Sequence, residues 1–141
     1  MEQLSLLDSS FRLAGAMATI RAAMRTAAGA PESAGRKLLV DRLNEAAERA
    51  GIRLTSGNTA AISKATLDKW LSPSDLSHPP SILALLVFCS VTQNIEPLRV
   101  AVQTLGFDLM TKEDRQLRDY ARAILDERAA RQRKNKLERE L

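Results

Sequence analysis

The sequence contains very little of the chemistry that metal and redox enzymes use. It has one cysteine, Cys89, and one histidine, His78, among 141 residues. A single cysteine excludes an internal disulfide and a cysteine-based zinc site, and a single histidine excludes a histidine-clustered metal centre. The sequence also shows no nucleophile–base pair, phosphate-cradling glycine loop or carboxylate cluster. We therefore expect a protein that is not an enzyme and has no catalytic residues, no metal site and no cofactor.

Long apolar runs and aromatic side chains are scarce as well. No stretch approaches the ~18 uncharged apolar residues of a membrane span, and no charged-then-apolar leader begins the chain. Apolar residues make up 45% of the sequence but aromatic residues only 4%. Aliphatic side chains must therefore fill the core. The composition predicts a cytoplasmic, globular protein with one modest core and no membrane contact.

The net charge of +4 comes from two basic blocks. Residues 12–71 carry +5 and residues 111–141 carry +3, whereas residues 1–11 and 72–110 carry −2 each. A basic block of this kind is typical of proteins that bind nucleic acid. The simpler interpretation is that the charge only aids solubility.

Hydrophobic periodicity predicts an all-α fold, because apolar residues recur every three or four positions and no alternating run is long enough for a sheet. The expected helices begin near Ser9 or Ser10, Ser33, Ser63, Ser81, Glu96 and Thr111. The helix from Ile82 to about Val91 is apolar on all sides, which predicts that it is fully buried. We expect Arg21 and Arg25 largely off the apolar stripe of the first helix, and Arg36 on the solvent face of the second.

These elements predict three parts of the chain. Residues 1–8 are expected to be a flexible N-terminus, and residues 9–110 a compact helical domain with a helix-turn-helix-like core. Residues 111–141 should form a long charged C-terminal helix that opens with a capping box from Thr111 to Asp114. The basic tail of that helix is either a solvated helix, disordered or a dimerisation element.

The segment Ser63–Leu71 is the most informative of the chain. A short helix with a polar, basic first turn, preceded by an amphipathic helix that ends at Gly51, is typical of a helix-turn-helix. Its inward face is expected to hold Leu67, Trp70 and Leu71. The candidate DNA contacts on its outward face are Ser63, Lys64, Thr66, Asp68 and Lys69. The alternative is an ordinary surface helix with ordinary lysines.

The connection between the two helices is longer than the usual turn of three to four residues. Either the second helix continues past Gly51, or residues 53–62 form an inserted loop or wing, and a short hairpin is a further alternative. This segment adds Arg53, Ser56, Asn58 and Thr59 as candidate contacts to the DNA backbone.

Several separated elements resemble the small helix-turn-helix proteins of temperate, Mu-like phages. The similarity covers roughly residues 38–110 and is carried by Lys64–Leu71, His78, Phe88-Cys89, Glu96-Pro97-Leu98-Arg99 and Gly106. This resemblance implies a repressor-like DNA-binding fold and a role in phage or prophage regulation.

Two hypotheses for the function follow. In the first, the protein is a sequence-specific, DNA-binding transcriptional regulator that binds double-stranded DNA as a homodimer. In the second, it is a helical adaptor protein of phage origin that binds a host or phage protein and no DNA. His78 has no acid or nucleophile motif near it in the sequence, so we expect a structural or exposed side chain there.

Overall fold

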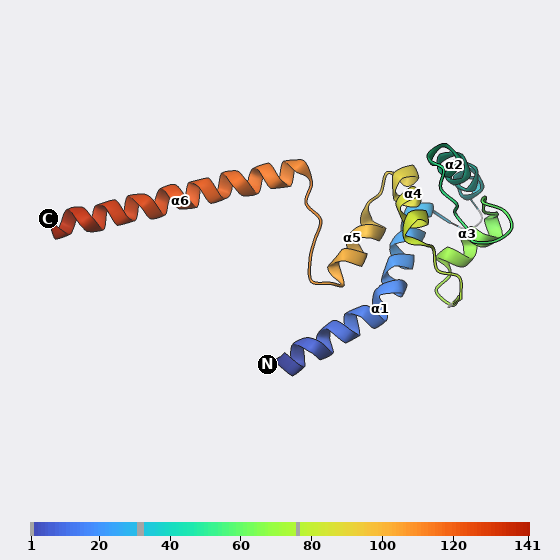
Figure 1. Ribbon diagram of the computed structural model, residues 1–141, viewed down its shortest axis with the longest axis horizontal. Coiled ribbons are helices and arrows are strands. Elements are labelled where there is room, and N and C mark those ends of the chain that lie inside the picture. Colours follow the sequence, from blue (N-terminus) through green and yellow to red (C-terminus); the bar gives the residue numbers. More distant parts are fainter. Residues whose placement is uncertain (1, 31–32, 76) are drawn as a thin grey trace. The chain divides into compact units, whose positions relative to one another are not determined.

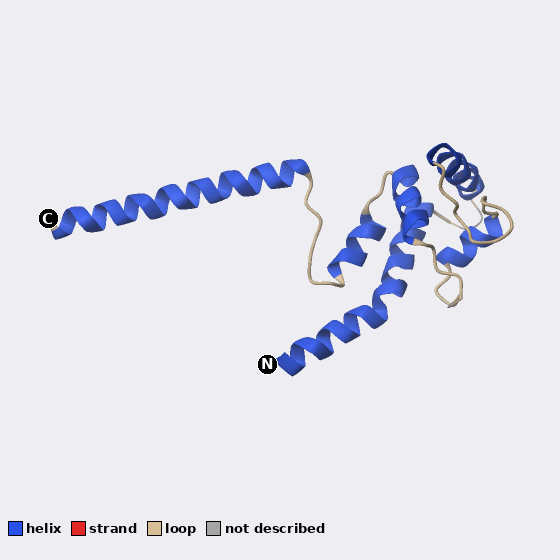
Figure 2. Cartoon of the chain, in the orientation of Figure 1, coloured by secondary structure: helices blue, strands red, loops and turns tan. Residues whose placement is uncertain are grey.

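The computed structural model describes residues 2–30, 33–75 and 77–141, with side chains described from residue 13 onward. Over these ranges the chain forms helices and loops and no strand, which confirms the all-α prediction (Figure 2). The helices, labelled in Figure 1, are α1 (Glu2–Ala28), α2 (Ala34–Ala50), α3 (Lys64–Leu71), α4 (Ile82–Thr92), α5 (Glu96–Gln103) and α6 (Lys112–Glu140).

The chain divides into two units. The first, Met1–Asp108, contains α1 to α5, and the second, Leu109–Leu141, contains α6. Within the first unit α1 packs against α2, α3 and α5, and α4 packs against α2 and α5. The described hydrophobic core therefore belongs to the first unit.

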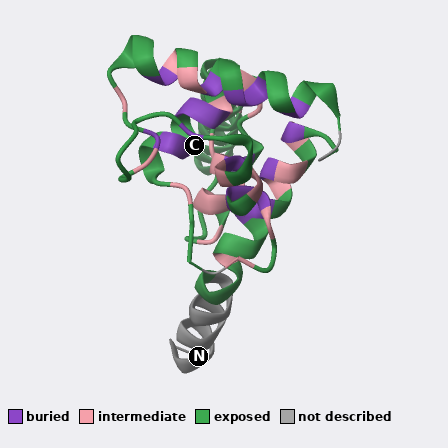
Figure 3. Ribbon diagram, turned by 90° about the vertical axis from the view of Figure 1, so that its right-hand side faces the viewer, coloured by how far each residue is buried: buried purple, intermediate pink, exposed green. Residues whose placement is uncertain are grey.

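The core is mostly aliphatic, as the scarcity of aromatic residues predicts, although Phe88 and Trp70 belong to it. Met24, Leu43, Leu67 and Phe88 are completely buried and come from α1, α2, α3 and α4 in turn. Figure 3 shows the buried positions on the faces that these helices turn toward one another. Each of these four helices thus contributes one stripe to a common core.

Three predicted helix starts are confirmed by their caps. The hydroxyl of Ser63 accepts the N–H of Thr66, and that of Ser81 accepts the N–H of Ala84. At the start of α6, Thr111 and Asp114 form the reciprocal bonds of a capping box, each 3.0 Å long. These bonds satisfy donors that the first turn of a helix leaves unpaired.

The predicted start of the first helix at Ser9 or Ser10 was wrong. Helix α1 begins at Glu2, so residues 2–8 are helical where a flexible segment was expected, and Met1 lies outside the described residues. The segment holds Leu, Glu and Gln, which favour helix, and it has no Gly or Pro before Gly15. A serine inside a helix costs only a few tenths of a kcal/mol, so Ser9 and Ser10 do not start a new element.

Helix α4 is not buried on all sides, contrary to the sequence prediction. Ala84, Leu85, Val87 and Phe88 are buried, but Ile82 is 77% exposed. Leu83 and Leu86 are exposed on the same helix. Helices α2 and α5 cover only part of its circumference. The face of Ile82, Leu83 and Leu86 is referred to below as the α4 face.

The C-terminal tail is helical up to Glu140, which decides between the solvated helix and the disordered segment expected from the sequence. Its polar side chains form ion pairs one turn apart, for example Arg131 with Glu127 at 2.9 Å. Such pairs stabilise a helix that has little packing of its own. Across the described ranges, no helix is both long enough and apolar enough to cross a lipid bilayer.

Candidate nucleic-acid interface

Helix α3 has one buried face and one exposed face. Leu67, Trp70 and Leu71 are buried in the core, as predicted, whereas Lys64, Ala65 and Lys69 are exposed. An isolated helix of eight residues is not stable in water, so the inward stripe holds α3 in place. The exposed face is thereby presented at a fixed position on the first unit.

Contacts at the N-terminus of α3 involve two of the predicted site residues. The Ser63 hydroxyl lies 3.2 Å from the Thr66 backbone nitrogen, which donates to it, and 3.2 Å from the Thr66 hydroxyl. Ser63 is exposed and Thr66 is half-buried. Both hydroxyls therefore help to fix the first turn and remain near the surface.

Two arginines of α1 hold the C-terminus of α3. Arg21 Nη1 donates to the carbonyl oxygens of Lys69 and Ser72, at 3.2 and 2.5 Å, and Arg25 Nη1 donates to that of Leu71 at 2.8 Å. The last carbonyls of a helix lack partners and carry partial negative charge, so a guanidinium suits them. Arg21 is only 2% exposed, so its guanidinium makes these hydrogen bonds inside the fold.

Asp68 lies between α2 and α3. One of its oxygens accepts from Arg36 Nη1 and the other from Lys64 Nζ, both at 3.1 Å. Arg36 also donates from Nη2 to the carbonyl of Gly29 at 2.7 Å and is 4% exposed. The prediction that Arg36 lies on the solvent face was therefore wrong. Its guanidinium closes the end of α1 and neutralises the Asp68 carboxylate.

The connection between α2 and α3 is a loop anchored at both ends. Helix α2 ends at Gly51, whose φ of 68° is left-handed, so the alternative of a longer helix is excluded. At the other end the Asn44 side chain donates to the carbonyl of Ile62 and accepts its N–H, at 2.9 and 2.8 Å. Leu54 and Ile62 are buried, which makes the loop part of the core. No hairpin forms in this fully described segment.

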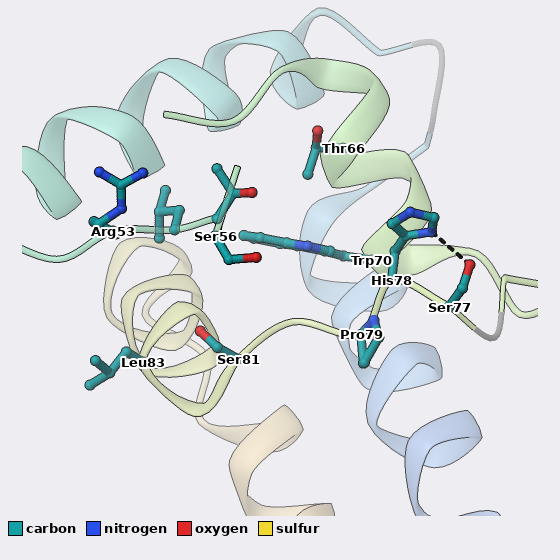
Figure 4. A pocket seen from close by; sticks show the side chains of 11 residues that line it. Arg53, Ser56, Thr66, Trp70, Ser77, His78, Pro79, Ser81 and Leu83 are labelled. Atoms are coloured by element: carbon teal, nitrogen blue, oxygen red, sulfur yellow. Dashed lines mark hydrogen bonds between the residues drawn. The ribbon is translucent and has the colours of Figure 1, made fainter. Parts of the chain in front are cut away.

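The four predicted loop residues lie in different surroundings. Arg53 donates to the carbonyl of Gly57 at 2.8 Å and lines a cleft of about 690 Å³ together with Thr66, Trp70 and His78 (Figure 4). Asn58 and Thr59 are exposed and do not line this cleft. The structure thus places Arg53 and Ser56 at the cleft that α3 also lines, but not Asn58 and Thr59.

His78 has an acid and a hydroxyl beside it, which corrects the expectation that it lacks such neighbours. Its Nδ1 lies 2.9 Å from the Ser77 hydroxyl and 3.2 Å from the Asp75 carboxylate. Both neighbours contact the same ring nitrogen. A catalytic triad instead uses both imidazole nitrogens, one toward the acid and one toward the nucleophile. This cluster is therefore a polar turn at the rim of the cleft.

The Asp75 carboxylate organises this turn. It accepts the backbone N–H groups of Ser77 and His78 at 2.9 and 3.0 Å. The N–H of Ser77 is the main cause that lowers the pKa of Asp75 below its ordinary 3.8, and the side chain of His78 adds to the effect. Hydrogen bonds to the charged form favour ionisation.

The sequence analysis missed the polar residues that hold α3 and its loop in place: Arg21, Arg25, Arg36 and Asn44. One signal was present for Arg21 and Arg25, since Leu71 is followed by Ser72-Pro73 and not by a helix-ending glycine. The carbonyls at this end then need donors from elsewhere in the chain. No sequence signal pointed to Asn44.

Within the part of the chain that the structure describes, no three His, Cys, Asp or Glu side chains gather into a group that could hold a metal ion. Comparison with protein-family models, with curated proteins and with solved structures finds no match.

Proposed function

We propose that the protein is a sequence-specific transcriptional regulator of the phage or prophage type, which places α3 in the major groove of double-stranded DNA. The observation that carries this proposal is the two-sided anchoring of α3. Its inner face packs into the core, and its C-terminal carbonyls accept hydrogen bonds from Arg21 and Arg25. Its outer face, with Lys64, Ala65 and Lys69, is exposed. A preorganised helix loses little conformational entropy when it binds.

Each exposed group has a chemical role in this proposal. Lys64 and Lys69 suit phosphate oxygens or guanine, and the small Ala65 between them allows the helix to approach base edges and a thymine methyl. Hydroxyl, amide and guanidinium groups nearby suit the DNA backbone; they belong to Ser63, Thr66, Arg53, Asn58 and Thr59. Asp68 acts indirectly, since its ion pair orients Lys64.

The regulator acts as a cytoplasmic homodimer and needs neither a cofactor nor a catalytic step. One helix of eight residues offers few base contacts. Two copies that bind half-sites one helical turn apart double those contacts and raise the effective affinity.

Selection from a random duplex library, followed by titration at about 50 and 200 mM salt, tests the function. We expect enrichment of a motif with two half-sites, and a loss of affinity of about 10²-fold between the two salts if four phosphates are contacted. Absence of binding at the lower salt contradicts the proposal. Salt-sensitive binding without an enriched motif contradicts its sequence specificity.

A second candidate function is that of an adaptor protein, and the exposed α4 face favours it. Ile82, Leu83 and Leu86 form an apolar surface of the kind that contacts partner proteins. An adaptor is expected to bind no duplex in the same titration, so that experiment separates the two candidates. A Leu86→Gln substitution adds a check, because Leu86 does not line the cleft that holds Arg53 and the change alters no charge, so it should leave DNA affinity unchanged in a regulator.

A further inference from the structure

Helix α6 carries an exposed apolar stripe. Leu117 and Tyr120 are each 67% exposed and Leu125 is 61% exposed. With Ala121 and Ile124 they recur at intervals of three and four residues, so they share one face of the helix. Helix α6 has no buried residue, and its unit contains no other helix that covers this face. These five residues are called the α6 stripe below.

Charges of opposite sign bound the α6 stripe along the helix axis. Glu113 precedes Leu117 by four residues, and Arg128 follows Ile124 by four residues, so both lie on the face of the stripe. Neither side chain forms an ion pair with another described residue. The face therefore runs from an acidic end through an apolar centre to a basic end.

We infer that two copies of the chain associate through the α6 stripe, with their α6 helices antiparallel. Pairing about a centre near Ala121 places Glu113 opposite the partner's Arg128, and by symmetry Arg128 opposite the partner's Glu113. The apolar residues between them then meet those of the second copy. Such an isologous contact is the usual arrangement of a homodimer with twofold symmetry.

The charge pattern selects the direction of pairing. In a parallel pair Glu113 would face the partner's Glu113, and Arg128 would face the partner's Arg128. Like charges placed together disfavour association, whereas the antiparallel pair makes two attractions. The inference gives the homodimer proposed above a surface and an orientation, and it does not depend on DNA binding.

Charge reversal tests the pairing in the full-length protein. The variants are Glu113→Lys, Arg128→Glu and the double variant, with dimerisation measured by sedimentation over a concentration series. Each single reversal turns two attractions into repulsions and should weaken the dimer about tenfold or more. The double variant restores both attractions and should recover affinity close to that of the original chain.

Arg122→Glu is the matched control. It makes the same charge change in α6, but it lies two residues from Ile124 and so does not share the face of the stripe. A second pair compares Leu117→Lys, on the stripe, with Ala130→Lys, off it. We expect only the first of each pair to weaken the dimer. Circular dichroism of every variant should show the same helix content.

A monomer at all concentrations overturns the inference, and so does a dimer that none of the stripe variants weakens. Single reversals without effect, together with weakening by Leu117→Lys, would indicate a parallel pair and overturn the orientation. A monomer whose melting temperature falls with Leu117→Lys would assign the stripe to a contact within one chain. DNA affinity is measured separately, so loss of dimerisation and loss of DNA binding remain distinct results.

Discussion

At the scale of single residues, Arg21 connects α1 to the carbonyl end of α3. Replacement by methionine keeps much of the side-chain volume but leaves the carbonyls of Lys69 and Ser72 without their donor. Loss of charged hydrogen bonds to partly buried acceptors costs about 2–3 kcal/mol. We expect Arg21→Met to lower the free energy of unfolding by that amount in urea denaturation. Lys37→Met, at an exposed position of α2, should change it by less than about 0.5 kcal/mol.

Asp75 gives the protein a contribution to stability that depends on pH. Its pKa is lowered in the folded state, so the ionised carboxylate stabilises the fold. The contribution is fully present above the unfolded value, near 3.8, and is lost as the pH falls through the lower folded pKa. We expect the original chain to be more stable than Asp75→Asn at about pH 6. Below about pH 3 the difference should shrink.

Thermal unfolding of both proteins across this pH range measures the difference directly. A gap in melting temperature that stays constant from neutral to acid pH would show that the carboxylate charge does not matter to the turn. The matched control is Asp41→Asn, at an exposed position of α2, which should change the melting temperature little anywhere in this range.

At the scale of secondary-structure elements, two glycines should respond in opposite ways to alanine. Gly51 ends α2 with a φ of +68°, and Gly15 lies inside α1; a Cβ added at either position meets no atom within 4 Å. Only the backbone then decides the effect. Gly51→Ala should destabilise by about 1 kcal/mol because L-residues disfavour the left-handed region. Gly15→Ala should stabilise by about 0.5–1 kcal/mol.

Urea denaturation of the two glycine variants provides the measurement, since each differs from the original chain by one methyl group. Destabilisation by Gly15→Ala would mean that α1 is not a regular helix at that position. A neutral Gly51→Ala would mean that α2 ends in another way.

The order of the elements was accessible from the sequence because periodicity and capping residues act locally. The helix α3, its cap at Ser63 and its inward Leu67, Trp70 and Leu71 were predicted in this way. The position of Arg21 inside the fold was not, because a buried arginine depends on carbonyls some fifty residues further along the chain. The exposed α4 face was also missed, since composition reveals apolarity but not which neighbours cover it.

For the candidate site, the sequence predicted which residues of α3 are exposed, but not how their side chains are paired. Lys64 and Lys69 are exposed on α3, but the Asp68 carboxylate forms ion pairs with Arg36 and Lys64. The pair with Lys64 lies within α3, but the pair with Arg36 joins α2 and α3, depends on tertiary packing and leaves no local signal. The anchoring of the loop by Asn44 also depends on tertiary structure, because its partner Ile62 lies 18 residues further along the chain.

At the scale of the whole molecule, the two units should fold independently. All described buried residues lie in the first unit. We expect a chain of residues 1–108 to unfold cooperatively, with a melting temperature within about 2 °C of that of the full chain. Differential scanning calorimetry at low protein concentration makes this comparison. Loss of the cooperative transition would show that α6 is needed for the core.

The central claim is that α3 presents a DNA-binding face, and charge reversal on that face tests it most directly. The variant Lys64→Glu/Lys69→Glu is compared with Lys37→Glu/Arg49→Glu, which alters exposed positions of α2. Each double variant reverses two charges, which lowers the net charge by two units per substitution and takes it from +4 to zero. Trp70, the only tryptophan, is buried on the inner face of α3, so unchanged fluorescence shows that α3 is still in place.

The measurement is the affinity for the selected duplex by fluorescence anisotropy at about 50 mM salt. The account predicts that the α3 variant loses about 10²-fold or more, because two contacts become repulsions. The α2 variant, with the same net charge, should lose less than about tenfold. Equal losses in the two variants, or retained affinity in a correctly folded α3 variant, would contradict the account.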